Sequence, residues 1–317
     1  MLDHSRAPRL ASLLNGLNHR GYRFVTPTPA THALVLRRSS RREAQSLADI
    51  LGWSLPFREE ILDTDIFALL TEAEILRRTD EGRWRSTVRV SSINGVLFLH
   101  SAFPTDDQDA VFLGPDSYRF ADAISAELAR EGAAEGAHIL DIGTGSGVGA
   151  LVASASCPGA VIAMTDINPK AMAFARINAQ VAGVHVQGVV ASDLSDLAGQ
   201  FDFVMANPPY IVDPAHRAYR DGGDGHGAAV ALDMTKMALS RLAAGGRFLL
   251  YTGSAIIDGS DPLHAALADI ADQEDCSLRY READPDVFGE ELANPAYQDV
   301  DRIAVVVGVF QRGRGSD

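Results

Sequence analysis

The residues with the clearest chemistry follow a short apolar run. The segment "FDFVMANPPYIVD" places Asn207, Pro208, Pro209 and Tyr210 directly after residues that are typical of a buried strand. The prolines fix the backbone and remove two N–H donors, which leaves carbonyl groups that point outward. The Asn207 side-chain oxygen and the Pro208 carbonyl can each accept one hydrogen of a planar nitrogen, such as an amide or a ring amine. Tyr210 is expected to hold the flat group by stacking.

This arrangement predicts the transfer of an electrophilic methyl group to a planar nitrogen. The lone pair of such a nitrogen is delocalised, and hydrogen bonds that hold its hydrogens push it toward tetrahedral character. Catalysis would then rely on positioning and preorganised polar groups, without a covalent intermediate or a strong base. The structural alternative is that Asn-Pro-Pro is an ordinary strand terminator with a cap.

A second motif is a glycine loop after an earlier predicted strand. "HILDIGTGSGVGA" contains Asp141, Gly143, Gly145 and Gly147, and glycines let a backbone approach a ligand closely. The letters GSGVGA satisfy the dinucleotide fingerprint. In the other register Asp141 faces a cationic ligand group, which favours S-adenosylmethionine because a pyrophosphate would be repelled. A glycine turn without a ligand is the remaining alternative.

Acidic residues also end the next two predicted strands. Asp166 is placed to accept hydrogen bonds from two ribose hydroxyls, and Ile167 to pack on an adenine face. Asp193 can accept from the adenine amine. Each acid has a structural alternative as a helix cap. Ligands of open α/β sheets bind at the carboxyl ends of the strands, so acids at three successive strand ends favour a cofactor site.

The motifs require a mostly parallel sheet with helices on both sides. Residues after about 115 alternate short apolar runs with helical patterns, as such a sheet demands. The predicted strands are 137–142, 160–167, 184–190, 201–206 and 246–253, followed by an antiparallel hairpin formed by "SLRYREADPDV" and "DRIAVVVGVF". The helical stripes are Phe174, Ile177 and Val181; Val230, Met234 and Met237; and Leu263, Leu267 and Ile270.

Residues 1–110 predict a separate small domain. Helices are expected at about 7–19, at about 40–52 and from a capping-box pattern of Thr71 with Glu74. Asn94-Gly95 lies between two strand-like runs and is typical of a tight hairpin. Helices followed by a hairpin favour a winged-helix-like domain that recruits the substrate.

Composition limits the classes of protein to consider. The chain has 317 residues, of which 46% are hydrophobic and 22% charged, and this describes a globular protein with a core. No apolar run is long enough to span a membrane and no signal core is present, so we expect a cytoplasmic protein. Cys157 and Cys276 are expected to be reduced thiols.

The net charge of −14 is carried by the part of the chain after residue 110, where 28 acids face 14 Lys and Arg. An acidic domain repels phosphate backbones, which disfavours nucleic acid as a partner. Several His and Asp residues lie within 213–226, but their spacing matches no common metal pattern, so we expect no metal.

Together these motifs resemble class I S-adenosylmethionine-dependent methyltransferases with an NPPY motif, above all HemK-like glutamine N-methyltransferases and their small-domain relatives. The resemblance covers roughly 112–312. It implies that Pro115, Asp116 and Tyr118 in "VFLGPDSYRFADAI" cover the cofactor or the substrate entrance. The same motif also serves adenine amino-methyltransferases that act on DNA or RNA. The N-terminal part departs from the family, which usually has a smaller all-helical domain there.

The sequence therefore predicts an α/β, Rossmann-like methyltransferase domain at 111–317, with a seven-stranded sheet and an antiparallel last strand, behind a small domain at 1–110. The expected acceptor is a protein glutamine or another amide; the alternatives are a nucleic-acid amine and a small molecule, and more distantly an NAD-dependent oxidoreductase or a non-catalytic cofactor-binding module. The predicted cofactor-binding residues are Asp141, Gly143, Thr144, Gly145, Gly147, Asp166, Ile167, Asp193 and Asn207. The predicted catalytic residues are Asn207, Pro208 and Tyr210, and the substrate-binding residues are Pro115, Asp116, Tyr118, Pro209 and Tyr210; Phe288 and Glu290-Glu291 are further candidates for the substrate side.

Overall fold

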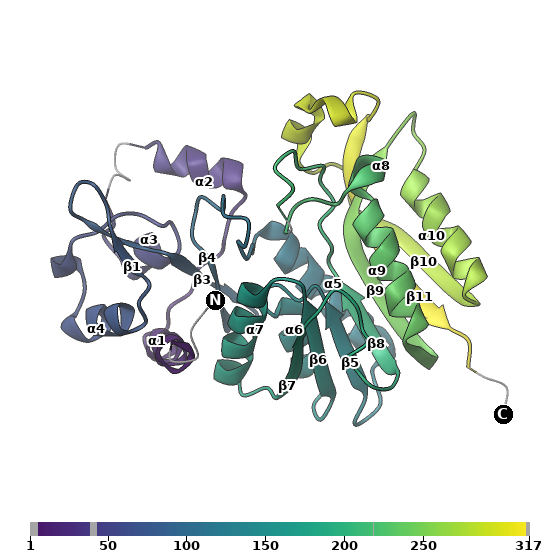
Figure 1. Ribbon diagram of the computed structural model, residues 1–317, viewed down its shortest axis with the longest axis horizontal. Coiled ribbons are helices and arrows are strands. Elements are labelled where there is room, and N and C mark those ends of the chain that lie inside the picture. Colours follow the sequence, from purple (N-terminus) through teal and green to yellow (C-terminus); the bar gives the residue numbers. More distant parts are fainter. Residues whose placement is uncertain (1–5, 39–42, 218, 315–317) are drawn as a thin grey trace.

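The computed structural model describes residues 6–38, 43–217 and 219–314. A seven-stranded sheet with flanking helices forms the larger part, and the N-terminal elements pack beside it (Figure 1). No helix among the described residues is long and apolar enough to cross a membrane. Both cysteines are free thiols and both are buried.

The sheet has the strand order β10-β11-β9-β8-β5-β6-β7. Its strands are β5 (His138–Ile142), β6 (Val161–Asp166), β7 (Val186–Val190), β8 (Phe201–Ala206), β9 (Leu242–Ile256), β10 (Cys276–Asp284) and β11 (Arg302–Arg312). The strands β5 to β9 pair in parallel, whereas β11 runs antiparallel to both β9 and β10. The predicted fold class, including the antiparallel last strand, is therefore confirmed.

Helices cover both faces of the sheet, and this explains why its strands are almost continuously apolar. In β8, Phe203 and Met205 pack on one side and Val204 and Ala206 on the other, because successive side chains alternate across a strand. The first face carries α5 (Pro115–Glu131), α6 (Val148–Ser156) and α7 (Pro169–Ala182); the second carries α9 (Ala229–Ser240) and α10 (Pro262–Gln273). The short helices α8 (Asp224–Gly227), η3 (Gly289–Ala293) and η4 (Pro295–Tyr297) lie in the connecting segments.

The strand order reverses at β5, which has β6 on one side and β8 on the other. Ligand crevices of open α/β sheets form at such a point, outside the carboxyl ends of the strands. Ile142 at the end of β5 pairs in register with Ala206 at the end of β8. The glycine loop and the NPPY segment therefore begin side by side.

The N-terminal elements are helices followed by two small antiparallel ladders. They are α1 (Ala7–His19), α2 (Pro29–Leu36), α3 (Leu47–Leu51), η2 (Glu59–Ile61), α4 (Thr64–Glu72), β1 (Leu76–Arg78), β2 (Trp84–Ser86), β3 (Val88–Ile93) and β4 (Val96–Ser101). The hairpin predicted at Asn94-Gly95 is present, with both residues at positive φ (49° and 83°), as a two-residue turn with matching twist requires.

The N-terminal core is completed by one face of α7. Ala171, Phe174 and Ile177 are at most 2% exposed and belong to the same apolar cluster as the buried residues of α1 and β4. Asn178 is fully buried and bonds both the N–H and the C=O of Leu99 in β4, and it also donates to the Ser146 carbonyl of the glycine loop. The N-terminal part is thus fastened directly to the element behind the cofactor loop.

Some predicted elements were wrong in extent or direction. The helix expected at about 40–52 is only α3, Leu47–Leu51, and residues 39–42 lie outside the described part. Thr71 and Glu74 do not begin a helix, because α4 ends there: the Thr71 hydroxyl donates to the Phe67 carbonyl, and Glu74 adopts φ 55° before β1. The stripe of α9 that faces the sheet is Ala231, Thr235 and Ala238; Val230, Met234 and Met237 are half-buried.

Candidate active site

A cavity of about 410 Å³ opens at the carboxyl ends of β5, β6 and β8. It brings together residues from the glycine loop, the ends of three strands, the start of α5 and the NPPY segment. Of the predicted site residues, those on the cavity wall are Asp116, Gly143, Thr144, Gly145, Asp166, Ile167, Asp193, Asn207, Pro208, Pro209 and Tyr210. The wall also includes Phe288, one of the candidates for the substrate side.

Asp141 lies beneath the glycine loop and is not on the cavity wall, contrary to our expectation that it meets the ligand directly. The residue is 2% exposed, and its Oδ2 accepts from the Thr144 hydroxyl (2.6 Å) and from the Ala150 N–H (2.9 Å). A Cβ on Gly149 would lie 2.8 Å from this carboxylate, so only glycine leaves the room that it occupies. Burial raises the pKa of Asp141 to about 7. Asp141 therefore holds the loop and the start of α6 from behind.

Gly147 is also absent from the wall, and its contribution is to the path of the backbone. It adopts φ 87° as the N-cap of α6, and a Cβ there would lie 3.3 Å from Ala175 of α7. Gly143 and Gly145 have φ 66° and 57° and lie on the wall itself. Of the three loop glycines, Gly143 and Gly145 are therefore the ones placed where the backbone could approach a ligand.

Asp166 joins the second strand to the glycine loop. Its two oxygens accept from the Gly145 N–H and the Asn168 N–H, each at 2.8 Å. Burial raises the pKa of Asp166, although these two hydrogen bonds oppose the rise. Beside it, Ile167 is 58% exposed on the wall and offers an apolar surface to a flat ring.

Asp193 lies on the exposed rim of the cavity. Its Oδ1 accepts from both the hydroxyl (2.6 Å) and the N–H (2.9 Å) of Ser195, which supports a local turn on the wall; no helix begins here among the described residues, so Asp193 is not a helix cap. Hydrogen bonds from Ser195 lower the pKa of Asp193. The carboxylate is therefore ionised at neutral pH and can accept further hydrogen bonds.

Asn207 and Pro208 present polar atoms that the protein does not use. Asn207 is half-buried on the wall, and within the described part of the chain its amide makes no hydrogen bond. No donor among the described residues reaches the Pro208 carbonyl either. The Asn207 amide oxygen and the Pro208 carbonyl are therefore left to accept hydrogen bonds from a bound ligand.

Tyr210 is buried and engaged, which corrects the expectation that its ring stacks on the acceptor. The residue is 7% exposed, its ring packs over Gly253 of β9, and its hydroxyl donates to Asp116 Oδ2 at 2.9 Å. Asp116 Oδ1 accepts from Tyr251 of β9, also at 2.9 Å. Burial raises the pKa of Asp116, against the effect of these two tyrosines and of Arg119. Tyr210 thus ties the NPPY segment to a buried carboxyl group at the start of α5.

Two of the residues taken from the family resemblance lie elsewhere. Pro115 is the first residue of α5 and is not on the wall. The Tyr118 hydroxyl accepts from the Thr26 N–H at 2.9 Å, so this side chain joins α5 to the N-terminal part instead of covering the cavity. Of this group, only Asp116 reaches the cavity.

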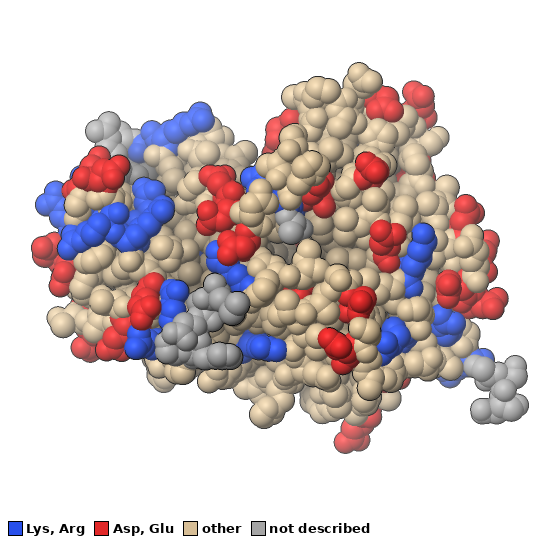
Figure 2. Space-filling model, in the orientation of Figure 1, with Lys and Arg blue, Asp and Glu red and all other residues tan. Residues whose placement is uncertain are grey.

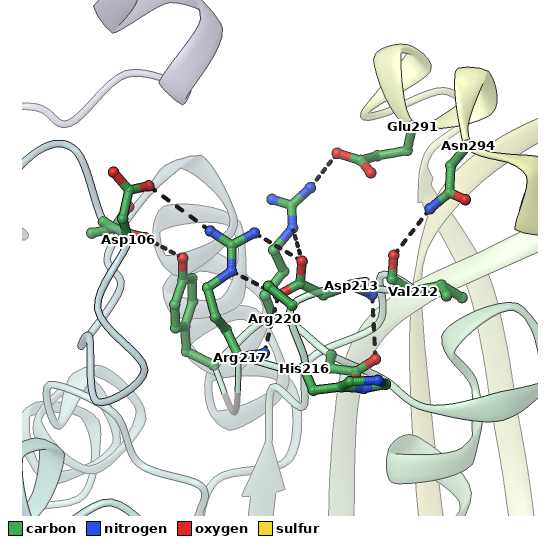
Figure 3. Close-up of polar contacts among 12 residues, drawn as sticks. Asp106, Val212, Asp213, His216, Arg217, Arg220, Glu291 and Asn294 are labelled. Atoms are coloured by element: carbon green, nitrogen blue, oxygen red, sulfur yellow. Dashed lines mark hydrogen bonds and ion pairs between the residues drawn. The ribbon is translucent and has the colours of Figure 1, made fainter.

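The loop that follows the motif closes one side of the cavity through a charged network (Figure 3). Asp213 is 2% exposed and accepts two hydrogen bonds from the Arg217 guanidinium, at 2.7 and 2.8 Å, which lower its pKa to about 2. Arg220 pairs with Glu291, and the His216 Nδ1 lies 2.6 Å from Asp221 Oδ2. The Arg220–Glu291 pair fastens the loop to η3, and the Tyr219 hydroxyl, which donates to the Thr105 carbonyl, fastens it to the segment before α5.

Sequence reasoning missed several residues of the cavity wall. His216, Tyr219, Arg220 and Asp221 line it, as does Pro29 from α2. The available signal was position, because these loop residues directly follow NPPY. Their identities match no motif, and the contribution of α2 depends on tertiary packing that a local pattern does not report.

The wall fits S-adenosylmethionine better than a dinucleotide. Its acids offer acceptors for hydroxyl and amine groups and attract a cation, and Ile167 supplies an apolar surface. Of the described wall residues, the only Lys or Arg is Arg220, which is already paired with Glu291. A pyrophosphate would therefore find no Lys or Arg on this wall, among the described residues, whose charge is not already balanced by a carboxylate.

Comparisons with known proteins agree with this reading of the site. The family model "Methyltransferase small domain" matches residues 117–257. The chain is 32% identical over 262 residues to a release factor glutamine methyltransferase of Bradyrhizobium diazoefficiens, across 77% of this chain and 87% of the relative. A second one, from Deinococcus radiodurans, is 33% identical over 168 residues, which are 51% of this chain and 58% of the relative, so this match spans little more than half of that protein.

A solved structure supports the fold alone. The crystal structure of Trm5b from Pyrococcus abyssi aligns with a TM-score of 0.50 at 15% identity and covers 74% of this chain and 62% of that one.

Fold and site together define a class I S-adenosylmethionine-dependent methyltransferase. Within that class, the chain belongs to the HemK-like family of release factor glutamine methyltransferases.

Proposed function

We propose that this enzyme methylates the side-chain nitrogen of a glutamine in a protein, and that the protein is a translation release factor. The named activity of its relatives supports this acceptor. The acidic charge of the catalytic part supports a protein over a nucleic acid. As expected from the sequence, we place the reaction in the cytoplasm.

The observation that carries the proposal is the pair of unused acceptors at Asn207 and Pro208. Both lie on the cavity wall, and in the described part of the chain neither has a partner. A carboxamide nitrogen has two hydrogens in its plane, and each of these two oxygens can hold one of them. S-adenosylmethionine, when bound, supplies a methyl group on a positively charged sulfur. Asp166, Ile167 and Asp193 with Gly143 and Gly145 are the residues that would hold it.

Three residues of the NPPY motif then have defined roles. Asn207 and Pro208 are the catalytic residues, because they orient the acceptor nitrogen and draw its hydrogens aside so that its lone pair is exposed. Tyr210 is a positioning residue that acts through Asp116. The nitrogen loses one proton after it gains the methyl group, and no strong base is required.

The substitution Asn207→Ala tests the clamp. We expect methyl transfer to fall about 100-fold or more, the scale associated with losing one preorganised polar group. Affinity for S-adenosylhomocysteine, measured by calorimetry, should persist. Unchanged transfer would show that Asn207 does not hold the acceptor, and loss of cofactor binding alone would assign it to the cofactor instead.

The acceptor class is tested with radiolabelled S-adenosylmethionine in a matched lysate that is then separated into protein, nucleic-acid and small-molecule fractions. We expect label in the protein fraction and on a purified bacterial release factor. Label in the nucleic-acid fraction alone would replace the protein with an exocyclic amine of RNA or DNA. Label in small molecules alone would point to a metabolite.

A further inference from the structure

A carboxamide presents a carbonyl oxygen beside its nitrogen, and the clamp of Asn207 and Pro208 serves only the nitrogen. We propose that Arg220 donates a hydrogen bond to the carbonyl oxygen of the acceptor carboxamide. It is thus a specificity-determining residue for the proposed reaction. The inference rests on the proposed function, because it assumes an amide acceptor.

The backbone fixes Arg220 beside the clamp. The Ile211 N–H, one residue after the motif, donates to the Arg220 carbonyl at 3.3 Å, and Ile211 and Asp221 form a parallel bridge. The Gly222 N–H donates to the Ile211 carbonyl at 2.8 Å. Arg220 also belongs to the cavity wall together with Asn207. These backbone contacts therefore hold Arg220 next to the NPPY segment.

The Arg220 guanidinium keeps donors to spare. A guanidinium has five N–H donors. Nη2 bonds Glu291, while Nε lies 4.0 Å from Asp213 Oδ1, beyond hydrogen-bond range. Within the described residues it has no further acceptor. By contrast, the nearby Tyr219 hydroxyl on the same wall already donates to the Thr105 carbonyl.

The charge of Arg220 is balanced where it lies. Figure 3 shows the guanidinium groups of Arg217 and Arg220 both next to Asp213, with Glu291 beyond that of Arg220. With Asp106, whose Oδ1 lies 4.0 Å from Arg217 Nη1, three carboxylates face the two guanidinium groups, so the cluster has no net positive charge. Arg220 can therefore offer strong N–H donors without adding a net positive charge to a cavity that must accept a cationic cofactor.

Arg217 provides a matched control for Arg220. Its guanidinium makes the closer contacts to Asp213, two hydrogen bonds of 2.7 and 2.8 Å, and it supports the same loop. It is not on the cavity wall. If the loop arginines served only to hold the loop, replacing Arg217 would cost at least as much as replacing Arg220.

The experiment compares Arg220→Met, Arg220→Lys and Arg217→Met with the wild type, with a purified release factor as the acceptor. Methionine keeps an unbranched apolar side chain and removes the donors. We expect Arg220→Met to raise the acceptor KM about 10-fold to 100-fold, the range for a hydrogen bond to a charged donor. Arg220→Lys should restore part of the loss. Arg217→Met should leave this KM within about threefold.

Calorimetry with S-adenosylhomocysteine separates acceptor recognition from general damage. We expect the affinity of all three variants to stay within about twofold of the wild type. Equal rises in KM for Arg220→Met and Arg217→Met, or a parallel loss of cofactor affinity, would overturn the inference. So would an unchanged KM in Arg220→Met, which would leave the oxygen to another donor. Failure of the wild type to label the release factor would overturn the proposed function and this inference with it.

Discussion

At the scale of single residues, some polar groups of the site hydrogen-bond to other parts of the protein and others do not. Asn207 and Pro208 offer oxygens without partners in the described part of the chain, whereas the Tyr210 hydroxyl is committed to Asp116. The motif therefore contains a part that touches the acceptor and a part that holds the first in place. Tyr251 donates to the same carboxyl group from β9, outside the motif, and so provides an internal comparison.

Removing the Tyr210 hydroxyl should reduce turnover more than removing the Tyr251 hydroxyl. Both Tyr210→Phe and Tyr251→Phe delete one 2.9 Å hydrogen bond to Asp116 and keep the ring. Only Tyr210→Phe frees the segment that carries Asn207. We expect kcat to fall about 10-fold or more in Tyr210→Phe and less than about threefold in Tyr251→Phe, because small errors in position are costly in catalysis.

Thermal unfolding of both variants controls for stability. Each should lose about 1 to 3 kcal/mol, the cost of leaving a buried acceptor with one donor fewer. Equal kcat values in the two variants would mean that Asp116 supports the fold and does not position the motif.

At the scale of elements, the glycine loop is held from behind by a carboxyl group that favours its neutral form. Asp141 bonds Thr144 within the loop and Ala150 within α6. Burial raises its pKa to about 7, whereas an exposed Asp titrates near 3.9. Between about pH 4 and pH 7, Asp141 therefore keeps its proton in the folded chain but has lost it in the unfolded chain.

This difference predicts a pH dependence of stability that Asp141→Asn removes. The stabilisation from protonated Asp141 is complete below about pH 4 and is lost as the pH rises through about 7. The reason is that between these values only the folded state holds a proton on this group. The unfolding free energy of the wild type should fall relative to Asp141→Asn, by up to about 1.4 kcal/mol for each pH unit.

Urea unfolding at pH 5, 6, 7 and 8 measures this slope. Asp193→Asn is the control from the same cavity. The pKa of Asp193 is lowered, so this group is already ionised throughout the range from pH 5 to pH 8. If the wild type and Asp141→Asn change in parallel from pH 5 to pH 8, the carboxyl group is already ionised in the folded state.

Elements with a periodic or punctuated sequence could be predicted, and those set by tertiary contacts could not. The strand ends that carry Asp166 and Asn207 follow buried apolar runs, so their place at one edge of the sheet was evident from the sequence. The distinction between a wall residue and a supporting residue was not, because Asp141 and Asp166 are both aspartates near strand ends and differ in what packs around them. Thr71 with Glu74 satisfied a capping pattern at the end of a helix, where the pattern alone cannot tell the direction.

At the scale of the whole molecule, charge and packing divide the chain differently. Figure 2 shows Lys and Arg side chains gathered over the N-terminal part, while the other part presents mostly scattered acids on this face. The balance of 28 acids against 14 Lys and Arg after residue 110 agrees with that view. The apolar core is not divided at residue 110, because α7 packs on the sheet and also completes the N-terminal core. The division at 110 and 111, and the recruiting role of the first part, stay predictions.

The shared core predicts that the methyltransferase part is poorly stable alone. A fragment of residues 111–317 would expose Phe174 and Ile177, which are 1% and 2% exposed in the full chain. Exposing these two side chains costs roughly 3 to 6 kcal/mol, a large share of the stability of a typical domain. We expect the fragment to unfold at a lower temperature than the full chain and to bind a hydrophobic dye.

The same fragment with Phe174→Gln and Ile177→Gln should regain solubility, because its exposed face is then polar. A fragment that unfolds at the midpoint of the full chain and binds S-adenosylhomocysteine equally well would show that the N-terminal part only rests on α7.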